Sequence, residues 1–345
     1  MTFKYAFLCL KVSGLFFILL LFQQAHSQEN SYDPNDPIDI FLEKNAKNLG
    51  TPVNVLVYRN GSKEYLKETN TDFSIKIPAD AGEISQWFAI TTIMMLVDEN
   101  KLSLDDPISK YLPDMKKFLK GYVTIKDCIT HTTGIEKGNE NFKLGKSNFS
   151  SLDDEVMVYI TKRNISEKPG TAFVYSRIGI NLAAKAAEIA TKKSFDRLAA
   201  EKLFRPCGMK NTTYYAEKGG VNPFSGAKTT SQDCMNFMQM LLNKGIFNNK
   251  RVLSENVIKQ LLMTPSTDAA IKFIPEYAKY SHLALFNWVE EKDEEGNATL
   301  ISQGSNGTMA GIDFNKKLAW IIMMLQPEGD KKRTMAVQIR NILTE

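Results

Sequence analysis

The segment from Ile84 to Val97 is almost wholly apolar, whereas the residues on either side of it are polar. It is too long for a strand and too polar at its flanks to cross a membrane, so it predicts a helix buried on nearly every side. We expect this helix to begin near Gly82 and Glu83. A helix of this kind needs apolar layers around it, and a chain of 345 residues with 43% hydrophobic residues can supply them.

Strand-like segments lie at both ends of the remaining sequence, with helix-like segments between them. A Val/Leu alternation at 53–58 followed by Asn60-Gly61 predicts a hairpin, and further strands are expected at 283–289, 298–301, 308–313 and 318–325. Helices are expected at 153–160, 181–190, 195–203, 232–242, 255–262 and from Thr334 onward. The pattern predicts an α+β fold with one mixed sheet, in which a sheet lobe (about 28–100 and 283–345) carries a helical lobe (about 101–282).

The N-terminus predicts an export signal. An apolar run of 11 residues, Val12 to Phe22, precedes the small residues Ala25 and Ser27. A membrane-spanning helix needs about 20 apolar residues, so we expect a signal peptide over 1–27, a mature domain over 28–345 without a membrane span, and a secreted or periplasmic protein. The mature chain carries two more basic than acidic residues, a balance that indicates no nucleic-acid partner.

Cysteine and histidine spacing indicates no metal site. Beyond the signal the cysteines are Cys128, Cys207 and Cys234, and only His131 and His282 accompany them. No CxxC or HExxH spacing is present, so neither zinc nor another cofactor is predicted. Export would permit a disulfide, but the apolar neighbours of all three cysteines favour buried free thiols.

Several short motifs occur in a fixed order along the chain: KLSLDDPISKYLP at 101–113, HTTG at 131–134, PGT at 169–171, YS at 175–176, PCGM at 206–209 and GT at 307–308. Together they resemble the serine β-lactamase-like superfamily, which holds class C β-lactamases, penicillin-binding DD-peptidases and related esterases. The resemblance covers roughly residues 50–340. It implies an antiparallel sheet flanked by helices, plus an all-helical lobe.

The catalytic motifs of that superfamily are degenerate in this chain. Its enzymes begin the buried helix with Ser-x-x-Lys, because a serine hydroxyl is a weak nucleophile until a base takes its proton. The resemblance places Glu83 and Gln86 at those two positions. A glutamate cannot form the same acyl ester and a glutamine amide accepts no proton at neutral pH, so both halves of the nucleophile system are absent from these positions.

The second and third motifs are altered as well. Tyr-x-Asn is represented by Tyr175 and Arg177, and the His/Lys-x-Gly motif by Ser302 and Gly304. Tyr175 is expected either to move protons or to be a packed aromatic with a satisfied hydroxyl, and both interpretations stay open. Ser302 has no histidine or lysine placed to activate it, so we expect it to form hydrogen bonds only.

Other candidate nucleophiles are weaker. Ser85 lies about 200° around the helix from Glu83 and should face away from the pocket. Ser225 and Lys228 match Ser-x-x-Lys by letters, but this match precedes the wrong helix and is of a kind expected by chance. His131 is expected to bond local backbone in a turn distant from the nucleophile motif.

The substitutions also change the charges of the pocket, since Glu83 adds an anion and Arg177 a cation. A partly buried carboxylate without a partner is costly, so we expect these two side chains to form an ion pair that closes the site.

The sequence therefore favours an exported pseudoenzyme with a binding or scaffolding role, whose partner is a small-molecule or peptidoglycan-like ligand. Two alternatives stay open: an active hydrolase of the β-lactamase, DD-peptidase or esterase type with an atypical site, in which Glu83 could act as a base toward water, and a structural envelope protein without a ligand.

Overall fold

The computed structural model describes residues 34–138, 149–214, 220–262, 269–275, 282–283, 288–292, 298–303, 307–325 and 330–344. The expected signal peptide, 1–27, lies outside these residues. Within the described ranges, no helix is both long and apolar enough to cross a membrane.

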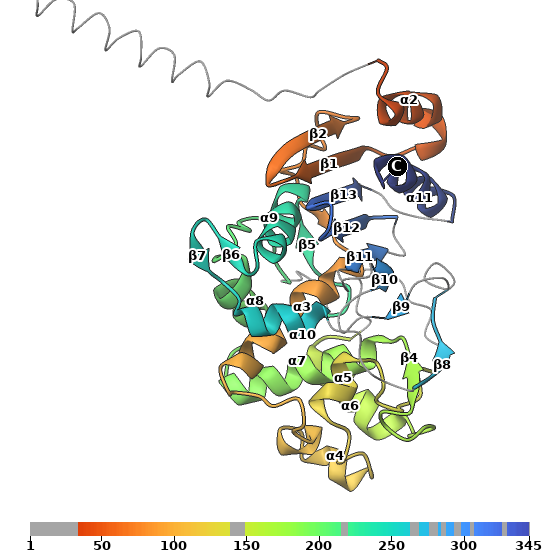
Figure 1. Cartoon of the computed structure of the whole chain (residues 1–345). Coiled ribbons are helices and arrows are strands. Elements are labelled where there is room, and N and C mark those ends of the chain that lie inside the picture. Colours follow the sequence, from red (N-terminus) through yellow and green to blue (C-terminus); the bar gives the residue numbers. More distant parts are fainter. Residues whose placement is uncertain are drawn as a thin grey trace, which may run out of the picture.

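A seven-stranded sheet joins the two ends of the chain in the order β2-β1-β13-β12-β11-β10-β9 (Figure 1). Its strands are β1 (Val53–Arg59), β2 (Ser62–Glu68), β9 (His282–Leu283), β10 (Trp288–Lys292), β11 (Ala298–Gln303), β12 (Met309–Asp313) and β13 (Leu318–Met324). Strand β13 lies between β1 and β12, and every pairing in the sheet is antiparallel. The α+β class is confirmed, and the sheet is antiparallel, as the resemblance implies, rather than mixed.

The hairpin between β1 and β2 follows directly from the sequence. Its turn residues Asn60 and Gly61 have φ values of 51° and 78°, the left-handed conformation that Asn-Gly adopts most easily. The strand expected at 283–289 is instead shared by β9 and β10, which pair antiparallel with each other. A continuous apolar pattern carries no signal for such a reversal.

Helices cover both faces of the sheet, which explains why β13 is buried along its whole length. Helix α9 (Ser231–Leu242) packs against β1 and β13, while α2 (Pro37–Leu49) and α11 (Asp330–Thr344) pack together on the opposite side (Figure 1). The sequence pattern did not indicate α2, in which polar and apolar residues are about equally frequent. Its signals were the N-cap Asp36, which accepts from the backbone N–H of Ile38, and the left-handed Gly50 at its end.

Helix α3 (Ile84–Asp98) contains the apolar segment from Ile84 to Val97, and its burial on nearly every side is confirmed. It packs against α7, α8, η2 and α10. The helices of this region are η1 (Ile108–Lys110), α4 (Asp114–Lys117), α5 (Ile125–Ile129), α6 (Leu152–Lys162), α7 (Arg177–Thr191), α8 (Phe195–Ala199), the π-helical η2 (Ala200–Phe204) and α10 (Glu255–Leu262). Short strand pairs complete the fold: β3 (Ala79–Asp80) with β5 (Lys228–Thr229), β4 (Ala172–Val174) with β8 (Ala270–Phe273), and β6 (Ile246–Phe247) with β7 (Lys250–Arg251).

Helix α7 begins at Arg177, earlier than the expected residue 181, because Gly179 hides the start of the helical pattern. This glycine lets α7 approach α5 closely, since a Cβ atom there would lie 2.1 Å from the carbonyl oxygen of Cys128. The contact brings the loop after α5 next to the residues that begin α7.

Candidate functional site

The two nucleophile positions lie at the start of α3. Glu83 occupies the N-cap position and Gln86 lies in the first turn of the helix, and both side chains are buried. The helix therefore presents a carboxylate and an amide where the resemblance requires an alcohol and an amine.

The Gln86 side chain bonds to two residues that are distant in the sequence. Its Nε2 atom lies 2.6 Å from the hydroxyl of Tyr175, and its Oε1 atom lies 3.3 Å from Nε2 of His131. The imidazole ring in turn packs against the Tyr175 ring, with centroids 4.8 Å apart. Residues 86, 131 and 175 thus form one buried cluster, which we call the Gln86 network.

The prediction that His131 lies far from the nucleophile motif was wrong. Its Nδ1 atom lies 3.0 Å from the carbonyl oxygen of Ser176, so its backbone partner is also distant in the sequence. The close approach of α5 and α7 at Gly179 accounts for this placement. His131 itself has a left-handed φ of 57°, a conformation that only the fold could reveal.

The imidazole of His131 is neutral at pH 7. Burial lowers its pKa to about 4, with a smaller opposing effect from the bond to the Ser176 carbonyl. Nδ1 lies closer to the Ser176 carbonyl oxygen (3.0 Å), which only accepts, than to the Ser176 backbone nitrogen (3.5 Å), so we assign the proton to Nδ1 and the acceptor role to Nε2. With this tautomer, all three side chains are hydrogen-bonded if the Gln86 amide is rotated so that its NH₂ group faces His131 and its oxygen faces the Tyr175 hydroxyl. The separation of 3.3 Å to His131 then suits an N–H···N bond, and the separation of 2.6 Å to Tyr175 suits an O–H···O bond.

Tyr175 is a packed aromatic with a bonded hydroxyl. Its ring lies 5.4 Å from that of Phe224, which also borders His131 at 6.3 Å. Of the two interpretations left open by the sequence, this geometry matches the second.

The expected ion pair between Glu83 and Arg177 is replaced by a different one. Arg177 Nη1 lies 3.3 Å from Glu155 Oε1 of α6, and the two side chains are 8% and 0% exposed. The same carboxylate oxygen accepts from the hydroxyl of Tyr159. Because α6 packs on α7, the first residue of α7 reaches α6 rather than α3.

The third motif is described in part. Ser302 is buried in β11 opposite Ala310 of β12, and the described residues show no hydrogen bond from it to the Gln86 network. Gly304 lies outside the described residues.

The alternative serines are occupied. Ser85 Oγ donates to the Gly82 carbonyl oxygen (2.6 Å) and accepts from the backbone N–H of Ala227 (3.0 Å), so its hydroxyl is engaged by backbone groups. Ser225 Oγ accepts from Asn222 Nδ2 at 3.1 Å, while Lys228 is exposed in β5. These two residues do not reproduce Ser-x-x-Lys at a helix start.

The cysteines Cys128, Cys207 and Cys234 are buried and free, and burial raises the pKa of all three thiols, that of Cys207 to about 12. Among the described residues no group of three or more His, Cys, Asp or Glu side chains is arranged for a metal ion.

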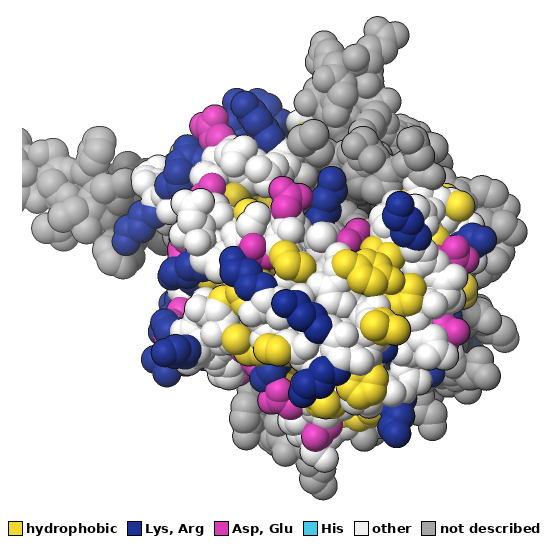
Figure 2. All heavy atoms as spheres, turned by 90° about the horizontal axis from the view of Figure 1, so that it is seen from below, with side chains coloured by type: hydrophobic (Ala, Val, Ile, Leu, Met, Phe, Trp, Pro, Cys, Tyr) yellow, Lys and Arg dark blue, Asp and Glu magenta, His cyan; other side chains and the backbone are white. Residues whose placement is uncertain are grey.

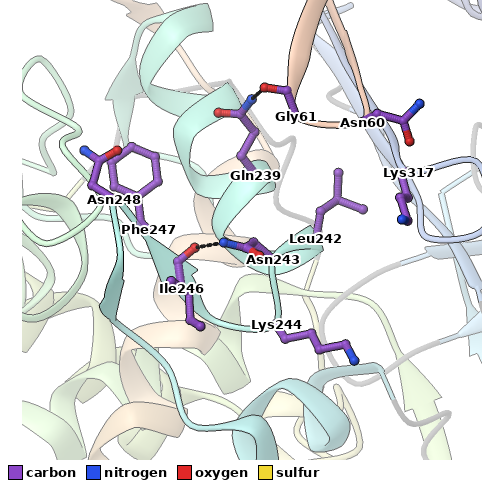
Figure 3. A pocket seen from close by; sticks show the side chains of 10 residues that line it. All are labelled: Asn60, Gly61, Gln239, Leu242, Asn243, Lys244, Ile246, Phe247, Asn248 and Lys317. Atoms are coloured by element: carbon purple, nitrogen blue, oxygen red, sulfur yellow. Dashed lines mark hydrogen bonds between the residues drawn. The ribbon is translucent and has the colours of Figure 1, made fainter.

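A groove of about 590 Å³ lies elsewhere, where the β1–β2 turn meets the C-terminal end of α9 and the β6–β7 hairpin (Figure 3). It is lined by Asn60, Gly61, Gln239, Leu242, Asn243, Lys244, Ile246, Phe247, Asn248 and Lys317. Two of its amides bond to nearby backbone carbonyls, Gln239 to Gly61 and Asn243 to Ile246. None of the residues of the degenerate motifs lines it.

Comparison with known proteins supports the resemblance. Residues 55–343 match the family model described as Beta-lactamase. D-alanyl-D-alanine-carboxypeptidase/endopeptidase AmpH of Escherichia coli (strain K12) is 24% identical, over 90% of this chain and 89% of that protein. Teichoic acid D-alanine hydrolase of Staphylococcus aureus is 30% identical, over 55% of this chain and 47% of that protein. The class C β-lactamase structure from Rhodobacter sphaeroides superposes with a TM-score of 0.67 at 17% identity, over 89% of this chain and 98% of that one.

Proposed function

The chain belongs to the β-lactamase family, and we propose that it is a member without the family's serine chemistry, which acts by binding a small-molecule or peptidoglycan-like ligand. Acyl transfer in this family needs an alcohol that forms an ester and a base that takes its proton. Glu83 and Gln86 supply neither function at the two positions concerned.

The Gln86 network is the observation that carries the proposal. Both polar atoms of the amide are engaged, one by Tyr175 and the other by His131. The neighbouring imidazole is a weak base because burial lowers its pKa to about 4. The position of the family's lysine is thus a closed, neutral set of hydrogen bonds with no group that accepts a proton at pH 7.

The second motif supports the same conclusion. Arg177 stands where family enzymes have an asparagine amide, and its guanidinium is bonded to Glu155 on α6. A side chain held in this way does not orient a substrate as the amide would. Three of the family's catalytic groups are therefore replaced by groups with structural partners or with different chemistry.

The ligand class is inferred from the relatives. Two of them are named for the hydrolysis of D-alanyl groups, one as a D-alanyl-D-alanine carboxypeptidase and one as a teichoic acid D-alanine hydrolase. We infer that this chain is exported, with residues 1–27 as its signal, and meets D-alanyl cell-wall material without cleaving it.

Acylation tests the loss of chemistry. The purified chain is incubated with a fluorescent penicillin and with an activated ester, and intact mass and product release are measured, with a penicillin-binding enzyme as positive control. We expect no acyl adduct and background turnover, since losing members of a nucleophile unit costs on the order of 10⁴ to 10⁶ in rate. Turnover at a rate typical of the family, retained after repurification and lost in Glu83→Gln, would establish the atypical hydrolase instead.

Binding is tested separately with a peptide ending in D-alanyl-D-alanine, by calorimetry and by its effect on thermal unfolding. Saturable binding without product supports the proposal, whereas the absence of binding favours the structural envelope protein. The variant Glu83→Ser/Gln86→Lys is a further control, in which we expect weak acylation because Arg177 and Ser302 remain altered. Strong labelling of this variant would show that the second and third motifs matter less than we propose.

A further inference from the structure

The loop that follows α4 exposes apolar side chains at the end of the molecule opposite α2 (Figure 1). Leu119 is 80% exposed, Tyr122 56% and Phe118 42%. Seen from this end, the surface carries a hydrophobic area with lysine and arginine side chains around it (Figure 2). We call residues 114–122 the α4 loop.

Leu119 is unfavourable here for two independent reasons. Its side chain is largely in water, and its backbone has a left-handed φ of 57°. The N–H of Lys120 donates to the Met115 carbonyl and that of Leu119 to the Lys116 carbonyl, which is the Schellman arrangement that ends a helix. The left-handed residue of this arrangement is usually glycine or asparagine, because a Cβ is strained there.

The loop is held in this conformation by its neighbour. The Lys120 ammonium is buried and donates to the Ile160 carbonyl oxygen of α6 at 2.6 Å. The apolar side chains are therefore presented on a fixed support rather than on a freely moving segment. A locally strained, exposed leucine on a rigid turn indicates a function outside the fold.

We propose that the α4 loop docks the protein onto a bilayer surface that carries anionic headgroups. The exposed charges of the loop are Lys116, Lys117 and Asp114, of which Lys117 and Asp114 form an ion pair, whereas Lys120 is buried. Lys116 therefore gives the exposed part of the loop an excess of positive charge, which an anionic surface attracts. The apolar residues of the loop include the aromatics Phe118 and Tyr122, which suit the interface between headgroups and acyl chains.

A bilayer fits these residues better than a protein partner does. The cores of protein interfaces are depleted of lysine, whereas at a membrane the long stems of lysines lie along apolar groups with their ammonium groups in the headgroup layer. Leu119 projects from a turn, and a soft interface accepts such a projection without a preformed pocket.

The test is co-sedimentation of the chain from residue 28, which contains every described residue, with vesicles. One set contains phosphatidylcholine alone and the other contains 30% phosphatidylglycerol. We expect binding to the anionic set that weakens with added salt. Leu119→Asn should reduce this binding roughly tenfold or more, because one buried leucine side chain contributes about that factor. The same change should raise the unfolding temperature, since asparagine tolerates the left-handed conformation.

Matched controls lie on α2. Ile40→Gln removes an exposed apolar side chain of 49% exposure, and Lys44→Gln/Lys47→Gln removes two exposed charges, to be compared with Lys116→Gln/Lys117→Gln. We expect only the α4-loop variants to lose vesicle binding. No binding by the natural chain, or equal binding by Leu119→Asn, would overturn the proposal. A concentration-dependent dimer that Leu119→Asn dissociates would also overturn it and identify the loop as a contact between two copies of the chain.

Discussion

The buried pair between Glu155 and Arg177 gives the sharpest test of how the second motif has changed. The charged atoms are 3.3 Å apart and both side chains are almost fully shielded from water. At an effective dielectric constant of about 20, two unit charges at this distance attract each other by about 5 kcal/mol. This attraction offsets the cost of burying both groups, so removing either one alone leaves the other as an unpaired buried charge.

We expect Arg177→Met and Glu155→Gln each to lower the free energy of unfolding by about 3–5 kcal/mol. The double variant leaves neither charge, so it should lose only about 1–3 kcal/mol, from the missing hydrogen bonds and altered packing. The coupling energy should therefore be at least about 3 kcal/mol. Urea unfolding at pH 7 with linear extrapolation measures all four corners of the cycle.

A second cycle serves as the control for this result. Arg177→Met combined with Glu83→Gln should be additive within about 0.5 kcal/mol, because the structure pairs Arg177 with Glu155. Additivity in the first cycle together with coupling in the second would refute the reasoning. That outcome would support the ion pair between Glu83 and Arg177 that the sequence predicted.

Three further predictions concern the site and its supports. Burial lowers the pKa of His131 to about 4 in the folded chain, against about 6.5 in the unfolded chain. As the pH falls below 6.5 the unfolded chain takes up a proton at this residue and the folded chain does not, so the stability present above pH 6.5 is lost. The free energy of unfolding should drop by about 2 kcal/mol between pH 7.5 and 5, and an equal drop in His131→Gln would contradict this cause. Gly134→Ala should destabilise the protein severely, since its Cβ would lie 2.0 Å from the Glu167 carbonyl oxygen. Gly61→Ala, with open space around its Cβ, should cost only about 1 kcal/mol of backbone strain, and thermal unfolding measures both variants. Gln86→Lys should cost about 4 kcal/mol at pH 7 if burial lowers the amine's pKa by about 3 units from its unfolded value of about 10.4. The cost should fall below about 1 kcal/mol at pH 10, where the buried amine is neutral and the unfolded amine is only partly charged; a loss in urea unfolding that does not shrink with pH would exclude this cause.

The sequence indicated most of the sheet and the central helix because their signals are local. The apolar run at 84–97 and the Asn60-Gly61 turn favour their conformations through residues close together in the sequence, without information from distant contacts. Helix α2 was not predicted although Asp36 and Pro37 are ordinary helix-start residues, since it lies in the Asn- and Asp-rich segment 28–50.

The contacts of the site could not be predicted in the same way. His131 and Gln86 are 45 positions apart, and their meeting depends on how closely α5 and α7 pack at Gly179. The resemblance assigned Arg177 to the second motif but carried no information on the direction of its side chain. That direction is set by α6, which supplies Glu155.

These contacts also bear on how the family's fold would persist if, as we propose, its serine chemistry is lost. A catalytic lysine in a buried site has to be held where its charged form is unfavourable, so the chemistry is maintained at the expense of stability. At residue 86 of this chain an amide fits between a hydroxyl and a neutral imidazole, and no charge is buried there. The Tyr175 and His131 rings of the network also pack against Phe224. Restoring the serine and the lysine therefore does not by itself restore the site, because His131 and Tyr175 are arranged to complement an amide, and Arg177 would still be held by Glu155.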